Sequence, residues 1–301
     1  MERIGFVGLG TIGGAIAKNI LKSGYPLMVY DIRPAAIQQL IGEGCQGAQS
    51  PAEVARHCRI TVTSLPGPPE VEEVALGVDG LLHGVHAGSI YVDLSSSNPD
   101  LIRRIATEFH SCGAQVMDAP LIVGKNGIAH RSVQVLASGP PEGYEQVKPV
   151  LDVFADTIVY AGELGTGTVI KLAHNLVRRG IGLAIGEGIV LGAKAGVDPE
   201  LLWDCMRWGL DVQLHQLAKT FPDTVFTGDF EARASFNIAL SRKDVGLATE
   251  LARQHSVPMP IAALVEQTMI EAVNRGWSDQ STAALFRLQE EAAGAAVRKR
   301  N

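Results

Sequence analysis

The stretch Ile4-Gly5-Phe6-Val7-Gly8-Leu9-Gly10-Thr11-Ile12-Gly13 decides the fold of this 301-residue chain. Its first four residues are typical of a short buried strand, and an amphipathic helical pattern follows the last glycine. Gly8 allows a tight turn, Gly10 lets the backbone approach a pyrophosphate, and Gly13 lets the helix pack closely. The helix N-terminus also attracts the anion. We therefore predict that a nicotinamide dinucleotide is bound by Gly8, Leu9, Gly10, Thr11, Ile12 and Gly13.

Short strand-like segments alternate with helical ones up to about Tyr160, as in a doubly wound parallel sheet. We expect buried central strands at Ile4–Val7, Met28–Tyr30, Ile60–Ser64, Ser89–Val92, Gln115–Met117, Val133–Leu136 and Thr157–Tyr160. Asn98 and Pro99 are typical of a helix start, which puts Ser95-Ser96-Ser97 at the carboxyl end of a strand. Open α/β sheets bind their ligands at that edge.

The remainder of the chain has a helical period, which predicts an all-α C-terminal half. We expect helices at 168–195, 198–209, 211–220, 238–256, 259–275 and 281–293. The first is rich in glycine, and each glycine inside a helix costs about 1 kcal/mol relative to alanine, so a buried interdomain or dimer helix would offset the cost. We predict a Rossmann dinucleotide-binding domain at 1–163 and an all-helical substrate and dimerisation domain at 164–301.

Composition narrows the class of partner to small molecules. The formal net charge is -6 and no long Lys/Arg run is present, so neither nucleic acid nor an anionic membrane is an expected partner. No apolar run approaches the ~20 residues needed to span a bilayer. Strand-like residues begin at Arg3, which leaves no space for a signal peptide, so we expect a cytoplasmic protein. The four scattered cysteines indicate no metal site.

An acidic residue, Asp31, follows the second predicted strand, 18 positions after Gly13. In dinucleotide folds a carboxylate there accepts hydrogen bonds from the adenosine ribose and repels a 2′-phosphate, which favours NAD over NADP. Arg33 could instead pair with a phosphate if its loop turned inward, so NADP stays possible. The other interpretation of Asp31 is a surface turn residue.

Four segments, taken together and in this order, resemble the β-hydroxyacid dehydrogenase family, which includes 3-hydroxyisobutyrate dehydrogenase. They are Gly8–Gly13, Asp118-Ala119-Pro120, Gly165–Asn175 and Lys243–Ala248. The resemblance spans essentially the whole chain and implies a helical domain like that of 6-phosphogluconate dehydrogenase. It implies that Lys171 is catalytic, that Asn175 positions the substrate oxygen or the lysine, and that Lys243 lies near the nicotinamide. It also implies cofactor contacts from Leu65, Pro66 and Ser96.

The residues around Lys171 support a catalytic role independently. Gly167, Lys171, His174 and Asn175 share one helical face, where a flat ring could approach the glycine closely. A lysine amine there can exchange a proton with an alcohol or carbonyl oxygen while hydride moves. Without the family pattern, Lys171 would be interpreted as a helix lysine with an extended stem, and His174 as a packing residue. Lys243 and its neighbour Asp244 could likewise be an exposed helix pair.

The chain departs from the family after Asp118-Ala119-Pro120. Where the family usually has a serine and glycines that hold a carboxylate, this chain has Ile122, Val123 and Gly124. Ile122 cannot donate a side-chain hydrogen bond and Val123 restricts close backbone approach, so we expect a narrower, more apolar substrate loop. A replacement anion contact could come from one of three nearby residues, although loop residues of this kind are often only solvated. These are Lys125, His130 and Arg131.

Three functions fit these features. The first is an NAD(P)-dependent oxidoreductase, a homodimer or homotetramer, that interconverts a small β-hydroxyacid-like primary alcohol and its aldehyde. The second is an imine reductase of related fold, which the apolar Ile122-Val123 pair favours and Lys171 argues against. The third is a cofactor-binding module without catalysis, since Rossmann folds are reused for other purposes.

Overall fold

The structure, a computed structural model, describes residues 1–124, 126–230 and 237–298. The chain divides into two compact units, Met1–Leu176 and Val177–Asn301, and the long helix α7 (Thr166–Lys194) belongs to both. Our predicted domain boundary at residue 163 falls just before this helix and stays a prediction. Among the described residues, no helix combines the length and apolar character that crossing a membrane would require.

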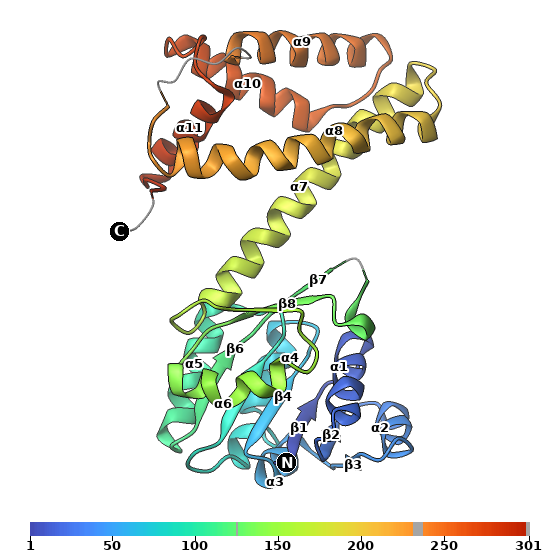
Figure 1. The fold of residues 1–301 in the computed structure, drawn as a ribbon, viewed down its shortest axis with the longest axis vertical. Helices are drawn as coiled ribbons and strands as arrows, with labels where there is room; N and C mark the ends of the chain where they lie inside the picture. Colours follow the sequence, from blue (N-terminus) through green and yellow to red (C-terminus); the bar gives the residue numbers. More distant parts are fainter. Residues whose placement is uncertain (125, 231–236, 299–301) are drawn as a thin grey trace. The chain divides into compact units, whose positions relative to one another are not determined.

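The first unit contains a six-stranded parallel sheet of order β3-β2-β1-β4-β5-β6 (Figure 1). Its strands are β1 (Ile4–Val7), β2 (Leu27–Tyr30), β3 (Gln46–Gly47), β4 (Ile60–Thr63), β5 (Ile90–Asp93) and β6 (Gln115–Asp118). This strand order is that of a doubly wound dinucleotide fold, so the predicted fold class is confirmed. The carboxyl ends of all six strands lie at one edge of the sheet, and the predicted ligand-binding loops begin at these strand ends.

Helices cover both faces of this sheet. They are α1 (Thr11–Lys22), α2 (Pro34–Ile41), α3 (Pro51–His57), α4 (Pro68–Leu76), α5 (Pro99–Ser111) and α6 (Pro141–Leu151). Apolar residues of α1, α2 and α6 join one core cluster, and those of α3, α4 and α5 join another. The predicted cap on α5 is confirmed, because the Asn98 side chain accepts hydrogen bonds from the Asp100 and Leu101 amides.

A second, three-stranded sheet corrects two of our strand predictions. It consists of β7 (Leu121–Val123), β8 (Val133–Ala137) and β9 (Thr157–Tyr160), with β7 antiparallel to β8. The prediction that the segments now seen as β8 and β9 are central strands of the main sheet is therefore wrong, and β9 is largely exposed. Alternation of apolar residues indicates how a strand is buried, but it does not say which sheet the strand joins.

The described part of the second unit is helical, as predicted. Its helices are the second half of α7, then α8 (Pro199–Thr220), a π-helical turn (Phe221–Val225), α9 (Ile238–Gln254), α10 (Pro260–Asn274) and α11 (Leu285–Ala293) after a short 3₁₀ turn (Thr282–Ala284). The two helices expected at 198–209 and 211–220 are one helix, because Gly209 weakens a helix by only about 1 kcal/mol and does not break it. The Glu187 carboxylate of α7 accepts the Ile261 and Ala262 amides at 2.7 and 3.0 Å, which caps α10.

Candidate active site

The glycine turn has the geometry that an anion site needs. Gly8 has a φ of +92°, a conformation that side chains rarely adopt, and a Cβ at Gly13 would lie 1.9 Å from the Gly8 carbonyl oxygen. A Cβ at Gly10, in contrast, would have no neighbour within 4 Å, so Gly10 faces open space. Among the residues that the structure describes, no side chain caps α1, which begins at Thr11. Its first amides are therefore available to a pyrophosphate, and the turn fits a dinucleotide.

Asp31 is attached directly to this turn. Its Oδ2 atom accepts the Leu9 amide at 2.7 Å, and its Oδ1 atom accepts the Arg33 amide at 2.8 Å and the Arg33 Nε at 3.0 Å. Burial acts to raise the pKa of Asp31, but the hydrogen bonds from Arg33 and Leu9 outweigh burial and hold that pKa below its ordinary value. Asp31 is therefore an ionised carboxylate next to the turn, and the exposed Arg33 is paired with it.

The loops after β4 and β5 lie at the same edge of the sheet. Leu65 adjoins the glycine turn, because a Cβ at Gly8 would lie 2.9 Å from its Cδ2 atom. The Leu65 amide donates to the Ser95 hydroxyl at 2.9 Å, which links the two loops. Pro66 and Ser96 are exposed. The structure thus brings the predicted cofactor residues of the first unit together around the glycine turn.

Two buried carboxylates at this edge, Asp93 and Asp118, were absent from our predicted site. They are paired in register at the ends of β5 and β6. Asp93 accepts the Thr63 hydroxyl at 2.8 Å and the Ser95 amide at 3.0 Å on Oδ1, while its Oδ2 atom has no hydrogen-bond partner within the described chain. Burial raises the pKa of Asp93, and its hydrogen bonds reduce that increase. The sequence analysis used Asp118 only as part of the segment Asp118-Ala119-Pro120, and its hydrogen bonds with the start of α7 could not be predicted from the sequence.

The predicted catalytic residues lie on α7, within the first unit. Lys171, His174 and Asn175 are each partly buried. Gly167 corrects our interpretation of this helical face: a Cβ there would lie 2.1 Å from the Leu136 carbonyl oxygen, so the backbone of β8 occupies the space that we assigned to a flat ring. The glycine therefore allows α7 to pack against β8 instead of against a ligand.

The predicted substrate loop is a strand. Ile122 and Val123 belong to β7, and the exposed Gly124 follows it. Ile122 is partly buried and stands opposite Gln134 of β8, so the two side chains share one face of the small sheet. Sequence reasoning missed Gln134, although the alternation of Val133-Gln134-Val135 could have placed its amide on the polar face. The substrate end that we predicted to be apolar at Ile122 therefore also includes the polar side chain of Gln134.

Three residues were candidates for a replacement anion contact. Lys125 lies outside the described residues. His130 is exposed, in a 3₁₀ turn at Ile128–His130. The Arg131 guanidinium donates to the backbone carbonyl oxygens of Asp152 and Ala155 at 2.6 and 3.0 Å. Arg131 thus binds the chain just after α6, which leaves His130 as the more accessible of the two described candidates.

Lys243, the predicted residue near the nicotinamide, lies on α9 in the second unit. Its amine is 3.2 Å from the carboxylate of Asp244, and both side chains are more than half exposed. This is the exposed helix pair that was the alternative interpretation of the motif. The cofactor contact implied by the family resemblance stays a prediction.

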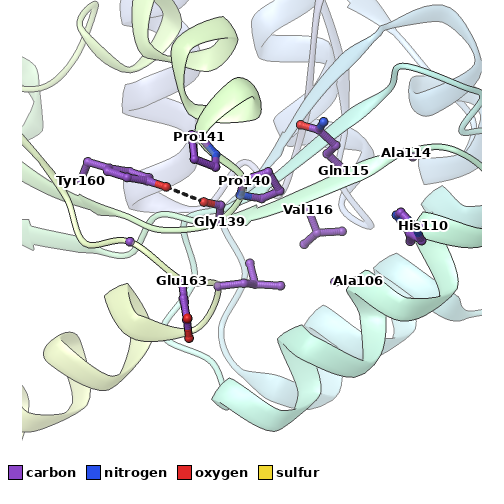
Figure 2. Close-up of a pocket in the computed structure, with 12 residues that line it drawn as sticks. Ala106, His110, Ala114, Gln115, Val116, Gly139, Pro140, Pro141, Tyr160 and Glu163 are labelled. Atoms are coloured by element: carbon purple, nitrogen blue, oxygen red, sulfur yellow. Dashed lines mark hydrogen bonds between the residues drawn. The ribbon is translucent and has the colours of Figure 1, made fainter.

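A separate cavity of about 500 Å³ lies beside α5 in the first unit (Figure 2). It is mainly apolar and includes Ala106, Val116 and Leu164, with the Tyr160 hydroxyl donating to the Gly139 carbonyl oxygen at 2.8 Å. None of the predicted site residues lines it, and its β6 residues lie toward the amino end of that strand. The chemistry of the glycine turn and α7 is therefore not located in this cavity.

A glycine turn at the carboxyl edge of a sheet of this strand order, with an acidic residue after β2, defines a dinucleotide-binding protein of the Rossmann class. Residues 3–162 match the family model for the NAD binding domain of 6-phosphogluconate dehydrogenase. Residues 165–289 match the family model described as NAD-binding of NADP-dependent 3-hydroxyisobutyrate dehydrogenase. The chain belongs to the β-hydroxyacid dehydrogenase family.

Relatives of known activity match over nearly the whole chain. A 3-hydroxyisobutyrate dehydrogenase from Pseudomonas aeruginosa is 30% identical over 95% of this chain and 99% of its own length. A 2-(hydroxymethyl)glutarate dehydrogenase from Eubacterium barkeri is 29% identical over 98% of this chain and 97% of its own. The protein is therefore an NAD(P)-dependent hydroxyacid oxidoreductase that acts on a CH–OH group of a small molecule.

Solved structures confirm the fold. An imine reductase from Myxococcus stipitatus in complex with NADP⁺ superposes with a TM-score of 0.87, covers 95% of this chain and 99% of its own, and is 19% identical. A variant of that enzyme was solved with NAD⁺, with a TM-score of 0.85 and 20% identity. At this identity the likeness concerns the fold alone, so it does not assign imine chemistry to this chain.

Proposed function

We propose that this enzyme interconverts a primary alcohol group of a β-hydroxyacid-like compound and its aldehyde, with Lys171 as the general acid/base. The observation that carries the proposal is the placement of Lys171, His174 and Asn175 on the first turns of α7. That helix starts against β6 and β8, at the edge of the sheet that also bears the glycine turn. A proton-exchanging amine and a dinucleotide-binding turn thus belong to the same edge of one unit.

The chain's residues would divide the reaction as follows. The bound nicotinamide supplies the hydride acceptor in oxidation and the hydride donor in reduction. Lys171 takes the proton from the alcohol oxygen in oxidation and returns it in reduction, while the Asn175 amide holds the substrate oxygen or the lysine. Gly8, Gly10 and Gly13 bind the pyrophosphate with the α1 amides, and Leu65, Pro66 and Ser96 contact the cofactor nearby. We place Lys243 at the nicotinamide end on family resemblance alone.

The substrate end would be bound by Ile122, Val123 and Gly124 together with the Gln134 amide beside them. Replacing Ile122-Val123 by Ser-Gly is expected to raise kcat/KM for short hydroxycarboxylates about 10- to 100-fold, since a hydrogen bond to a charged group contributes about 1.5–3 kcal/mol. The measurement is a panel of hydroxyacids, hydroxysulfonates and aromatic β-hydroxy compounds, assayed with NAD and NADP. Val159→Ser, a matched change on the exposed strand β9, is the control. If the double change neither creates nor removes activity on any carboxylate, this view of the substrate end is wrong.

We further propose that NAD is the preferred cofactor, because the ionised Asp31 would repel a 2′-phosphate. Asp31→Asn keeps an acceptor for the Leu9 amide but removes the charge. The ratio of kcat/KM for NADP to that for NAD is expected to rise at least about tenfold, a difference of about 1.4 kcal/mol. In Asp31→Asn the Arg33 side chain would pair with the 2′-phosphate of NADP instead of with Asp31. Adding Arg33→Ala to this variant removes that contact and should therefore reverse part of the gain. An unchanged ratio in Asp31→Asn would mean that the carboxylate does not select the cofactor.

A cyclic imine and the aldehydes that correspond to the panel compounds, assayed with NADH and NADPH, separate the alternatives. Faster reduction of the imine than of any aldehyde would favour the imine reductase function, which the apolar Ile122 supports. Tight NAD binding without turnover of any compound would favour a non-catalytic module. Turnover of a hydroxyacid that depends on Lys171 would support the proposed reaction over both.

A homodimer or homotetramer in the cytoplasm completes the proposal. What supports an oligomer is the apolar exposure of α7 and α8, where Leu176, Leu183 and Trp208 are 75%, 63% and 74% exposed. Monomeric proteins rarely leave large contiguous apolar patches in water. The glycines of α7 add to this, since a Cβ at Gly180 or Gly186 would have no neighbour within 4 Å. A second copy could pack closely against the helix there.

A further inference from the structure

The Asp118 side chain, fully buried at the end of β6, accepts four hydrogen bonds. Its Oδ1 atom accepts the Gly165 amide at 2.7 Å and the Ser138 hydroxyl. Its Oδ2 atom accepts the Thr168 amide at 2.7 Å and the Thr168 hydroxyl at 2.8 Å. All four partners donate hydrogens, so Asp118 serves as an acceptor in each of these bonds.

These bonds satisfy the amides at the start of α7. A helix begins with amides that have no partner inside the helix. Gly165 and Thr168 donate theirs to Asp118, and the Gly167 amide donates to the Ser138 oxygen at 2.9 Å. The Ser138 hydroxyl in turn donates a hydrogen bond to Asp118, so the carboxylate holds the Gly165 and Thr168 amides directly and the Gly167 amide through Ser138. Its negative charge also lies at the positive end of the helix dipole.

The first turn of α7 is also held by backbone packing, on the side that Asp118 contacts. Gly167 is so close to the Leu136 carbonyl oxygen that a Cβ would lie only 2.1 Å away. Lys171 follows Thr168 by three residues, so its side chain leaves the same side of the helix one turn later. A change in the bonds between Asp118 and Thr168 would therefore displace the turn that leads into Lys171.

We propose that Asp118 is a positioning residue for Lys171. Through its buried bonds to the first turn of α7, it holds the lysine amine where a proton is exchanged with the substrate oxygen. The inference rests on the proposed function of Lys171. Asp93, which is paired in register with Asp118, accepts its described hydrogen bonds from Thr63 and Ser95, whereas the described bonds to the first turn of α7 come from Asp118.

Steady-state kinetics on the best substrate of the panel test this proposal. Asp118→Asn places an amide donor where four hydrogens already point, and is expected to lower kcat about 10- to 100-fold, since a 1 Å misplacement can cost about 100-fold. The KM for NAD should stay close to the wild-type value, because the glycine turn is untouched. Thr168→Val should lower kcat in the same way, and Thr168→Ser, which keeps the hydroxyl, should restore it. The isotope effect on kcat with substrate deuterated at the carbon that gives up the hydride should rise in the impaired variants.

Asp198→Asn is the matched control, because Asp198 accepts the Glu200 and Leu201 amides at the start of α8 as Asp118 does for α7. It should leave kcat unchanged. If Asp118→Asn and Thr168→Val lower only the melting temperature, Asp118 is a structural cap and the proposal is wrong. If Asp118→Asn does not fold, the contrast between Thr168→Val and Thr168→Ser decides. Lys171→Ala, assayed alongside, separates failure of the Asp118 proposal from failure of the proposed function. A wild-type kcat in Lys171→Ala would contradict the proposed function itself.

Discussion

Replacing Lys171 by alanine is expected to lower kcat/KM about 10²–10⁴-fold, the usual contribution of a positioned general acid/base. Binding of NAD should change little, because the dinucleotide is held at the glycine turn and not at α7. The loss should therefore fall on kcat, as for an interaction made mainly in the transition state. Steady-state kinetics in both directions, with the cofactor affinity measured by calorimetry, provide the test.

Lys194→Ala is the matched control for this change. Lys194 lies on the same helix, is exposed, and is far along the chain from the predicted catalytic residues. Its removal should leave kcat/KM at the wild-type value. Full activity in Lys171→Ala on a substrate that the wild-type enzyme turns over well would exclude Lys171 as the acid/base, and another group would have to move the proton.

Two substitutions in the glycine turn, Gly13→Ala and Gly10→Ala, should separate an effect on stability from an effect on cofactor binding. Gly13→Ala places a methyl group 1.9 Å from the Gly8 carbonyl oxygen, a clash with backbone that a side-chain rotation cannot relieve. Overpacking of this kind costs about 1–3 kcal/mol or more, so the free energy of unfolding should fall by about 3 kcal/mol. Denaturant titration measures this loss.

Gly10→Ala should have the opposite profile. Its added methyl group meets no atom of the described residues within 4 Å, so the free energy of unfolding should stay near that of the wild type. The methyl group occupies the space through which the backbone approaches the pyrophosphate, so the Kd for NAD should rise about 100-fold, or about 2.7 kcal/mol. A Gly10→Ala protein that binds NAD as tightly as the wild type would place the pyrophosphate elsewhere.

The local rules of the chain were enough to predict the nucleotide-binding part. Strand, glycine turn and helix follow one another within a few residues, and the Asn98 cap depends only on its immediate neighbours, so both could be inferred without a structure. The second sheet could not, because the pairing of β7 with β8 joins segments separated by a loop. The interpretation of Gly167 failed for the same reason: the atom that fills its space belongs to Leu136.

The candidate site divides in a similar way. Lys171 and Asn175 came from a motif, and the structure places them on a helix as predicted. The bonds from Asp118 to Thr168 and Gly165 span about fifty positions of sequence, and nothing in the spacing of these residues indicates them. Gln134 was hidden because its importance depends on standing opposite Ile122. Contacts that join distant segments are thus the part of a site that periodicity does not reveal.

The cap on α10 has a consequence for how the chain is made. The carboxylate of Glu187, in the second half of α7, finds its amide partners at Ile261 and Ala262, more than seventy residues later. On a ribosome, that half of the helix therefore emerges long before the groups that complete it. Its cap is completed only after most of the C-terminal sequence has been made, whereas every strand of the Rossmann sheet precedes the start of α7.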